Sequence, residues 1–213
     1  MKGKAAAMSS KATAAAAWAA RGFRVFPILP DVPGAEGNAR KAKIPAWEGW
    51  TDWASSDPQQ VLSWWDTNEF NIGVLTDNMV VVDVDTKAGR DGLASWFDLY
   101  GGFDTLTVRT PSGGYHLYYG GANVGLSQGA LGRGLDVRSY HGYVLAPGST
   151  IEGVPYVVEI DDPIAQVPQE VLARCKPAFE RREERITTPA VAEDGRAIAL
   201  AVEFINRTKP AIA

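Results

Sequence analysis

The stretch Met79-Val80-Val81-Val82-Asp83-Val84-Asp85 decides the fold of this chain and points to its chemistry. A short apolar run that follows the turn residues Thr76-Asp77-Asn78 predicts a buried strand. Because side chains alternate along a strand, Asp83 and Asp85 are expected on the same side of the pleat. Two carboxylates this close favour a counter-ion such as Mg²⁺ or Mn²⁺. The alternative is that the two aspartates only end a strand.

On the N-terminal side of this stretch, the sequence predicts two helices and two strands. Asn71–Leu75 is a second apolar run, and the turn between the two runs predicts a tight hairpin. The segment Pro30–Lys43, rich in Pro, Gly, Asn and charge, is expected to be a mobile loop. The remaining elements are a helix over Ala12–Arg21 that ends at Gly22, a strand over Phe23–Leu29, and a helix from Ser56-Asp57-Pro58 to Trp65.

On the C-terminal side, short strands alternate with turns. Thr105–Arg109 and Tyr115–Tyr119 are expected to pair around the turn Pro111-Ser112-Gly113-Gly114, and the glycine-rich segment Gly120–Gly134 is expected to be a loop. The other predicted elements are helices over Asp91–Tyr100 and from Pro168 to about Arg182, and strands over Leu135–Arg138, Tyr143–Leu145 and Tyr156–Ile160. The pattern indicates an α+β fold with a mixed sheet and helices before and after it.

The 213 residues, 46% of them hydrophobic, suit one globular domain. We expect that domain to span residues 1–185, and residues 186–213 to be a linker and the start of a helical segment of a longer protein. No apolar run is long enough for a membrane helix, so we expect a cytoplasmic protein without a membrane partner. One cysteine, Cys175, and two histidines, His116 and His141, exclude a complete Cys/His zinc site.

The net charge of −4 is unusual for a protein that binds nucleic acid, so its distribution matters more than its sum. Met1–Trp50 carries eight basic and three acidic residues, whereas Thr51–Thr110 carries three basic and ten acidic residues. One interpretation is an acidic centre that holds divalent cations beside a basic flank that contacts phosphates. The other is an ordinary solvated surface.

A second motif, Thr110-Pro-Ser112-Gly113-Gly114-Tyr-His116, has the composition of a phosphate-binding turn. Its two glycines allow successive backbone N–H groups to turn toward an anion, and the hydroxyl of Ser112 adds a donor. His116 begins the next strand and could donate to a phosphate oxygen. The alternative is an ordinary hairpin turn followed by a histidine that is satisfied within the core.

A third motif, Gly134-Leu-Asp136-Val-Arg138, places a carboxylate and a guanidinium on one face of a strand. Asp136 could complete a metal site with Asp83 and Asp85, and Arg138 could neutralise a triphosphate. The alternative is a surface ion pair of little energetic value. Taken together, the three motifs are the set of groups that nucleotidyl transfer requires, since bound metals activate a 3′-hydroxyl and donors position the triphosphate.

The order of these motifs resembles the primase-polymerase domain of the archaeo-eukaryotic primase superfamily, found at the N-terminus of plasmid and phage replication proteins. The resemblance runs from about Trp18 to Leu172. Its motifs are Arg21-Gly-Phe-Arg-Val-Phe-Pro, Lys43-Ile-Pro, Trp64-Trp65, Asn71-Ile-Gly-Val, Val82-Asp-Val-Asp, Thr110-Pro-Ser-Gly-Gly-Tyr-His, Gly134-Leu-Asp-Val-Arg and Ala146-Pro-Gly-Ser.

The resemblance implies an RNA-recognition-like sheet packed with a second small α/β unit, with the active site in the cleft between them. It implies DNA-templated primer synthesis and polymerisation with Mg²⁺ or Mn²⁺ and without zinc. The implied partners are a single-stranded DNA template, an NTP or dNTP, and a fused or associated helicase. The implied site residues are the metal-binding catalytic acids Asp83, Asp85 and Asp136, the nucleotide-binding Ser112, Gly113, Gly114 and His116, and, as weaker correspondences, Arg138 and Lys43.

Two other functions remain open at this point. An Asp-x-Asp glycosyltransferase also binds a nucleotide through Mn²⁺, but it does not explain the Gly-Gly-Tyr-His element and would release a nucleoside diphosphate instead of pyrophosphate. A non-catalytic DNA-binding module of a replication initiator would bind DNA without metal and make no product.

Overall fold

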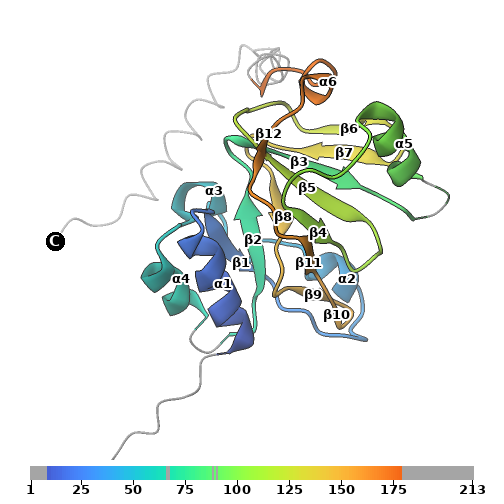
Figure 1. The fold of residues 1–213 in the computed structure, drawn as a ribbon. Coiled ribbons are helices and arrows are strands. Elements are labelled where there is room, and N and C mark those ends of the chain that lie inside the picture. Colours follow the sequence, from blue (N-terminus) through green and yellow to red (C-terminus); the bar gives the residue numbers. More distant parts are fainter. Residues whose placement is uncertain (1–8, 66–67, 88, 90, 179–213) are drawn as a thin grey trace, which may run out of the picture.

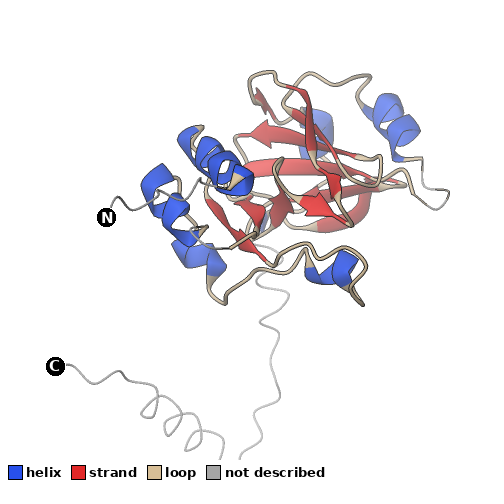
Figure 2. Ribbon diagram, turned by 90° about the horizontal axis from the view of Figure 1, so that it is seen from below, coloured by secondary structure: helices blue, strands red, loops and turns tan. Residues whose placement is uncertain are grey.

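The computed structural model describes residues 9–65, 68–87, 89 and 91–178 and shows an α+β fold with two main sheets (Figure 1). Seen from below, the sheets form one body with helices on its outer sides (Figure 2). The helices are α1 (Ser10–Ala20), α2 (Asn38–Lys41), α3 (Trp50–Trp53), α4 (Pro58–Trp64), α5 (Gly92–Leu99) and α6 (Gln169–Leu172). The strands are β1 (Val25–Ile28), β2 (Asn71–Leu75), β3 (Met79–Val84), β4 (Thr107–Arg109), β5 (Tyr115–Gly120), β6 (Ser127–Gly132), β7 (Leu135–Arg138), β8 (Tyr143–Leu145), β9 (Thr150–Ile151), β10 (Val154–Pro155), β11 (Val157–Ile160) and β12 (Ala165–Gln166).

The smaller main sheet is antiparallel and has the order β1-β2-β8. Helices α1 and α4 contact each other and cover this sheet (Figure 1). The sequence explains their boundaries, because Ser9 caps α1 through its side chain, and α4 begins at Pro58 after the N-cap Asp57. Both predicted helices are therefore confirmed.

The larger sheet has the order β11-β4-β5-β3-β7-β6, and β12 runs parallel to the end of β5. All its other pairings are antiparallel, so the sheet is mixed only through β12. Strand β3 lies near the middle of this sheet between β5 and β7. The predicted hairpin of β4 and β5 around Pro111–Gly114 is confirmed.

Both faces of the larger sheet are buried, which explains the nearly continuous apolar run in β3. Val80, Val82 and Val84 pack in a core that includes Trp96 of α5. Val81 packs on the opposite face, in the core shared with the smaller sheet, α1 and α4. Asp83 follows Val81 by two residues and therefore lies at the polar end of the face between the two sheets.

The predicted hairpin of β2 and β3 is wrong, because the two strands belong to different sheets. The turn between them is bonded to the segment before β8 instead. The N–H of Thr76 donates to the carbonyl of Gly142 at 3.0 Å, and its hydroxyl donates to the carbonyl of Ser139 at 2.7 Å. A buried apolar run can pair with any strand that reaches it, so local sequence did not specify the neighbour.

Two predicted loops contain regular structure. The segment Gly120–Gly134 includes the edge strand β6, which pairs with β7 through an irregular register that its glycines accommodate. The segment Pro30–Lys43 includes α2, whose buried Asn38 donates to Asp31 at 2.7 Å and to Glu152 at 2.8 Å. The bond to Glu152 joins parts of the chain that are 114 residues apart, so a local sequence pattern could not predict it.

The predicted helix from Pro168 is shorter than expected, because α6 ends at Leu172. Pro177 disfavours helical backbone in the residue before it and forms a bridge with Val124 instead. Residues 173–177 are described and are not helical, whereas residues 179–182 of that predicted helix, the linker and the final helical segment lie outside the described residues. Among the described residues, no helix is long and apolar enough to cross a membrane.

Candidate active site

Strand register places three of the predicted site residues in one row across the larger sheet. Asp83 on β3 lies opposite His116 on β5 and, on its other side, opposite Asp136 on β7. Residues directly opposite each other in an antiparallel pair project from the same face. Three motifs that lie 20 to 53 residues apart in the chain therefore meet on the face that looks toward the smaller sheet.

Charged groups connect this row of side chains. The Nε2 atom of His116 lies 3.7 Å from a carboxylate oxygen of Asp83. A guanidinium nitrogen of Arg138 lies 4.0 Å from Asp83 and 3.8 Å from Asp136. The second oxygen of Asp136 accepts a hydrogen bond of 3.1 Å from the N–H of Gly129 in β6. Arg138 thus stands between two carboxylates and partly neutralises both.

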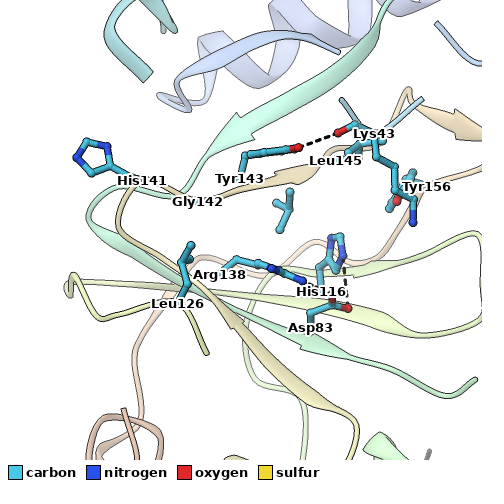
Figure 3. A pocket seen from close by; sticks show the side chains of 11 residues that line it. Lys43, Asp83, His116, Leu126, Arg138, His141, Gly142, Tyr143, Leu145 and Tyr156 are labelled. Carbon is cyan, nitrogen blue, oxygen red and sulfur yellow. Dashed lines mark hydrogen bonds and ion pairs between the residues drawn. The ribbon is translucent and has the colours of Figure 1, made fainter. Parts of the chain in front are cut away.

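A pocket of about 310 Å³ opens over these residues, between the two sheets (Figure 3). Its floor comes from β3, β5 and β7, and its opposite wall comes from β8. The lining residues are Lys43, Asp83, His116, Leu126, Arg138, His141, Gly142, Tyr143, Val144, Leu145 and Tyr156. The pocket brings together four of the predicted site residues, namely Lys43, Asp83, His116 and Arg138, while Asp136 lies beside it next to Arg138.

His116 is the most buried polar residue of the site, with 6% of its surface exposed. Burial lowers the pKa of its imidazole, and the negative charge of Asp83 opposes that effect. Its Nδ1 atom is buried without a hydrogen bond, although the backbone of Leu145 lies close enough to favour a proton on the ring. A neutral imidazole of this kind has one nitrogen that donates and one that accepts.

Lys43 reaches the same pocket from the segment that follows α2. Partial burial and the nearby cation Lys87 lower the pKa of its amine, whereas the carboxylates Asp83 and Asp85 raise it. The hydroxyl of Tyr143 donates to the backbone carbonyl of Lys43 at 2.8 Å and so fixes this segment to β8 (Figure 3). Lys43 and Arg138 therefore place two cationic side chains in the pocket.

Asp85 lies one residue beyond the end of β3 and does not line the pocket, although its charge acts on Lys43. Its N–H donates to the carbonyl of Gly134 at 2.8 Å. Among the described residues, no group of three or more His, Cys, Asp or Glu side chains comes close enough together to hold a metal ion. The facing carboxylates Asp83 and Asp136 offer the oxygen ligands that Mg²⁺ and Mn²⁺ prefer.

The turn of the second motif packs against the end of β3. Gly114 is required there, because a Cβ atom at this position would lie 2.3 Å from the carbonyl oxygen of Val84. Gly113 has a positive φ of 86°, and its N–H donates to Thr110 within the turn at 3.0 Å. The hydroxyl of Ser112 lies 3.0 Å from that of Thr110. These turn residues adjoin the carboxylate strand but do not line the pocket.

Sequence reasoning missed the aromatic wall of the pocket. Tyr143 and Tyr156 both line it, and the ring of Tyr156 lies 5.7 Å from that of His116. Burial and the charge of Asp83 raise the pKa of the Tyr156 hydroxyl. Both tyrosines occur in ordinary strand patterns, and only the packing of the two sheets brings them to the site.

Comparisons with known proteins agree with this arrangement. A protein-family model described as "Bifunctional DNA primase/polymerase, N-terminal" matches residues 15–170. That range includes every strand of both main sheets and every candidate site residue. A search of curated proteins finds no match.

Proposed function

Because the chain belongs to the family of bifunctional DNA primase/polymerase N-terminal domains, we propose that it synthesises and extends primers on single-stranded DNA through the pocket over Asp83. The family implies nucleotidyl transfer to DNA. The observation that carries the assignment to this pocket is the register that sets Asp83 directly opposite Asp136, with Arg138 between their carboxylates.

Asp83 and Asp136, together with Asp85 just beyond the end of β3, would hold two divalent cations, Mg²⁺ or Mn²⁺. Two such ions, when bound, would lower the pKa of the primer 3′-hydroxyl and stabilise the leaving pyrophosphate. The facing carboxylates suit this role, because like charges on neighbouring strands are unfavourable unless a cation compensates them. Arg138 supplies that compensation in part.

Lys43 and Arg138 would bind the triphosphate, since both cations line the pocket. His116, held neutral by burial, would donate one hydrogen bond to a phosphate oxygen without adding charge. The turn residues Ser112, Gly113 and Gly114 would set the position of the β3 end against which they pack. In-line attack then depends on positioning and needs no protein nucleophile.

The broader proposal follows the family resemblance. Residues 1–185 form the catalytic domain, in which the larger sheet takes the RNA-recognition-like role and the smaller sheet with α1 and α4 takes that of the second α/β unit. The setting is replication of a phage or plasmid genome in the host cytoplasm, together with a fused or associated helicase. The space between the sheets would then be the active-site cleft.

The decisive assay incubates the protein with single-stranded DNA, NTPs or dNTPs, and Mg²⁺ or Mn²⁺, with and without a labelled primer. We expect metal-dependent extension products, with one pyrophosphate released for each phosphodiester bond that is formed. Release of a nucleoside diphosphate from a sugar nucleotide would instead identify a glycosyltransferase. Metal-independent DNA binding without any product would identify a non-catalytic module and would remove the catalytic roles of Asp83 and Asp136.

A further inference from the structure

An open strand edge forms one wall of the pocket. Strand β8 is the last strand of the smaller sheet, so among the described residues only its edge toward β2 is paired. The segment Gly142–Leu145 lines the pocket at the same time (Figure 3). The free edge of a strand carries unpaired N–H and C=O groups that can bind a partner.

The register between β2 and β8 shows which residues of β8 direct their backbone groups toward β2. At one end of the strand pair, the N–H of Thr76 donates to the carbonyl of Gly142 at 3.0 Å. At the other end, the N–H of Ala146 donates to the carbonyl of Ile72 at 2.9 Å. Backbone groups alternate in direction along a strand, so Val144 between them also faces β2.

Tyr143 and Leu145 consequently direct their N–H and C=O groups away from β2, on the side of the pocket that both residues line. Within the described part of the chain, neither N–H has a hydrogen-bond acceptor. Leu145 is only 5% exposed, and its backbone also acts on the buried ring of His116. Backbone donors that line a pocket are available to a ligand with an accepting group.

The chemistry of this edge selects one part of a nucleotide. Tyr143 offers one donor and one acceptor, whereas Leu145 offers only its N–H, because its backbone carbonyl already interacts with the ring of His116. A triphosphate has only acceptor oxygens, which the carbonyl of Tyr143 would repel, and Lys43 and Arg138 already suit it. The base of an incoming nucleotide must pair with the template. A sugar hydroxyl both donates and accepts, so it matches the edge.

We propose that the free edge of β8, through the backbone groups of Tyr143 and Leu145, is the subsite for the sugar of the incoming nucleotide. A sugar hydroxyl would form the hydrogen bonds with this edge that a neighbouring strand would otherwise form. The inference rests on the proposed function of the pocket. Because backbone atoms would recognise the sugar, sugar binding should not depend on which side chain is present at position 143.

The test compares Tyr143→Pro with Tyr143→Ala. Both variants lose the phenol and its bond to Lys43, but only proline removes the N–H. Proline is tolerated at the first residue of an edge strand, which is the position of Tyr143 in β8. Dissociation constants for ATP and 2′,3′-dideoxy-ATP are measured by calorimetry with Mg²⁺ and without DNA, so that no turnover is needed.

We expect Tyr143→Ala to bind ATP about fivefold more tightly than dideoxy-ATP, as one net hydrogen bond gives. In Tyr143→Pro the two constants should become nearly equal through weaker binding of ATP. The same preference in both variants overturns the sugar subsite and leaves the proposed function intact. Failure of the wild type to bind any nucleotide defeats both proposals.

Folding of the variants provides the control for the edge itself. Val144→Pro removes an N–H that faces β2 and should destabilise the protein strongly, whereas Tyr143→Pro should fold like Tyr143→Ala. Leu145→Pro with Leu145→Ala repeats the comparison at the second position. If Tyr143→Pro fails to fold while Tyr143→Ala folds, the N–H belongs to the fold, and the proposal is wrong.

Discussion

Gly114→Ala tests how the glycine turn is fitted to the carboxylate strand. The added Cβ would lie 2.3 Å from the carbonyl oxygen of Val84, whereas real Cβ atoms essentially never approach within 3.0 Å. The two backbones must therefore separate by about 0.7 Å. Val84 cannot move alone, because it is paired with Tyr115 on one side and Leu135 on the other. We expect overpacking of this kind to lower the free energy of unfolding by about 1–3 kcal/mol.

Thermal and urea unfolding measure this effect. For a domain of this size, the loss corresponds to a decrease in Tm of roughly 2–12 °C. Gly102→Ala is the matched control, because a Cβ there meets nothing within 4 Å, and it should leave the stability unchanged or slightly higher. Nucleotide affinity should fall in Gly114→Ala only. Equal stability of the two variants would refute the close packing of the turn against β3.

Three further predictions use buried or charged groups near the site. Ser139→Ala leaves the N–H of Val124 and the carbonyl of Met79 without their partner, and should cost about 1–3 kcal/mol in urea unfolding; an unchanged midpoint contradicts it. The pKa of His116 is lowered in the folded protein, so below about pH 6.5 the unfolded chain binds a proton that the folded chain does not. The free energy of unfolding should therefore decrease as the pH is lowered in metal-free buffer. His116→Asn should show a flatter pH profile, and parallel profiles would refute the assignment. Arg138→Ala should weaken ATP binding severalfold and tighten Mn²⁺ binding to the nucleotide-free protein, because it removes the cation between the two carboxylates; calorimetry with each ligand separates the two effects.

The elements nearest the site could be predicted from the sequence because their signals are local. The valine run of β3, the glycine turn between β4 and β5, and the Asp-x-Arg strand β7 each carry their own pattern of burial and turn residues. The cross-strand meeting of Asp83, His116 and Asp136 followed once these strands paired.

The partner of β2 could not be predicted in this way. Strand β2 is buried throughout and pairs with β1 and β8, and the bonds of Thr76 to the segment before β8 hold the turn at which the chain crosses to the other sheet. The position of Tyr143 and Tyr156 in the pocket depends on the same crossing. Strand β6 and the short helix α2 were missed because their glycine-rich and polar sequences favour loops, and pairing with β7 or the buried Asn38 overrides that preference.

The central claim is that Asp83 and Asp136 together form the metal-dependent centre of nucleotidyl transfer. Its most direct test is primer extension on single-stranded DNA with Mg²⁺ or Mn²⁺ by Asp83→Asn, Asp136→Asn and the control Asp98→Asn, which changes an exposed aspartate on α5. We predict that both site variants fold and bind DNA but lose at least a thousandfold in extension rate, about 4 kcal/mol of transition-state stabilisation. The control should keep the wild-type rate. Extension by either site variant at the wild-type rate would contradict the account.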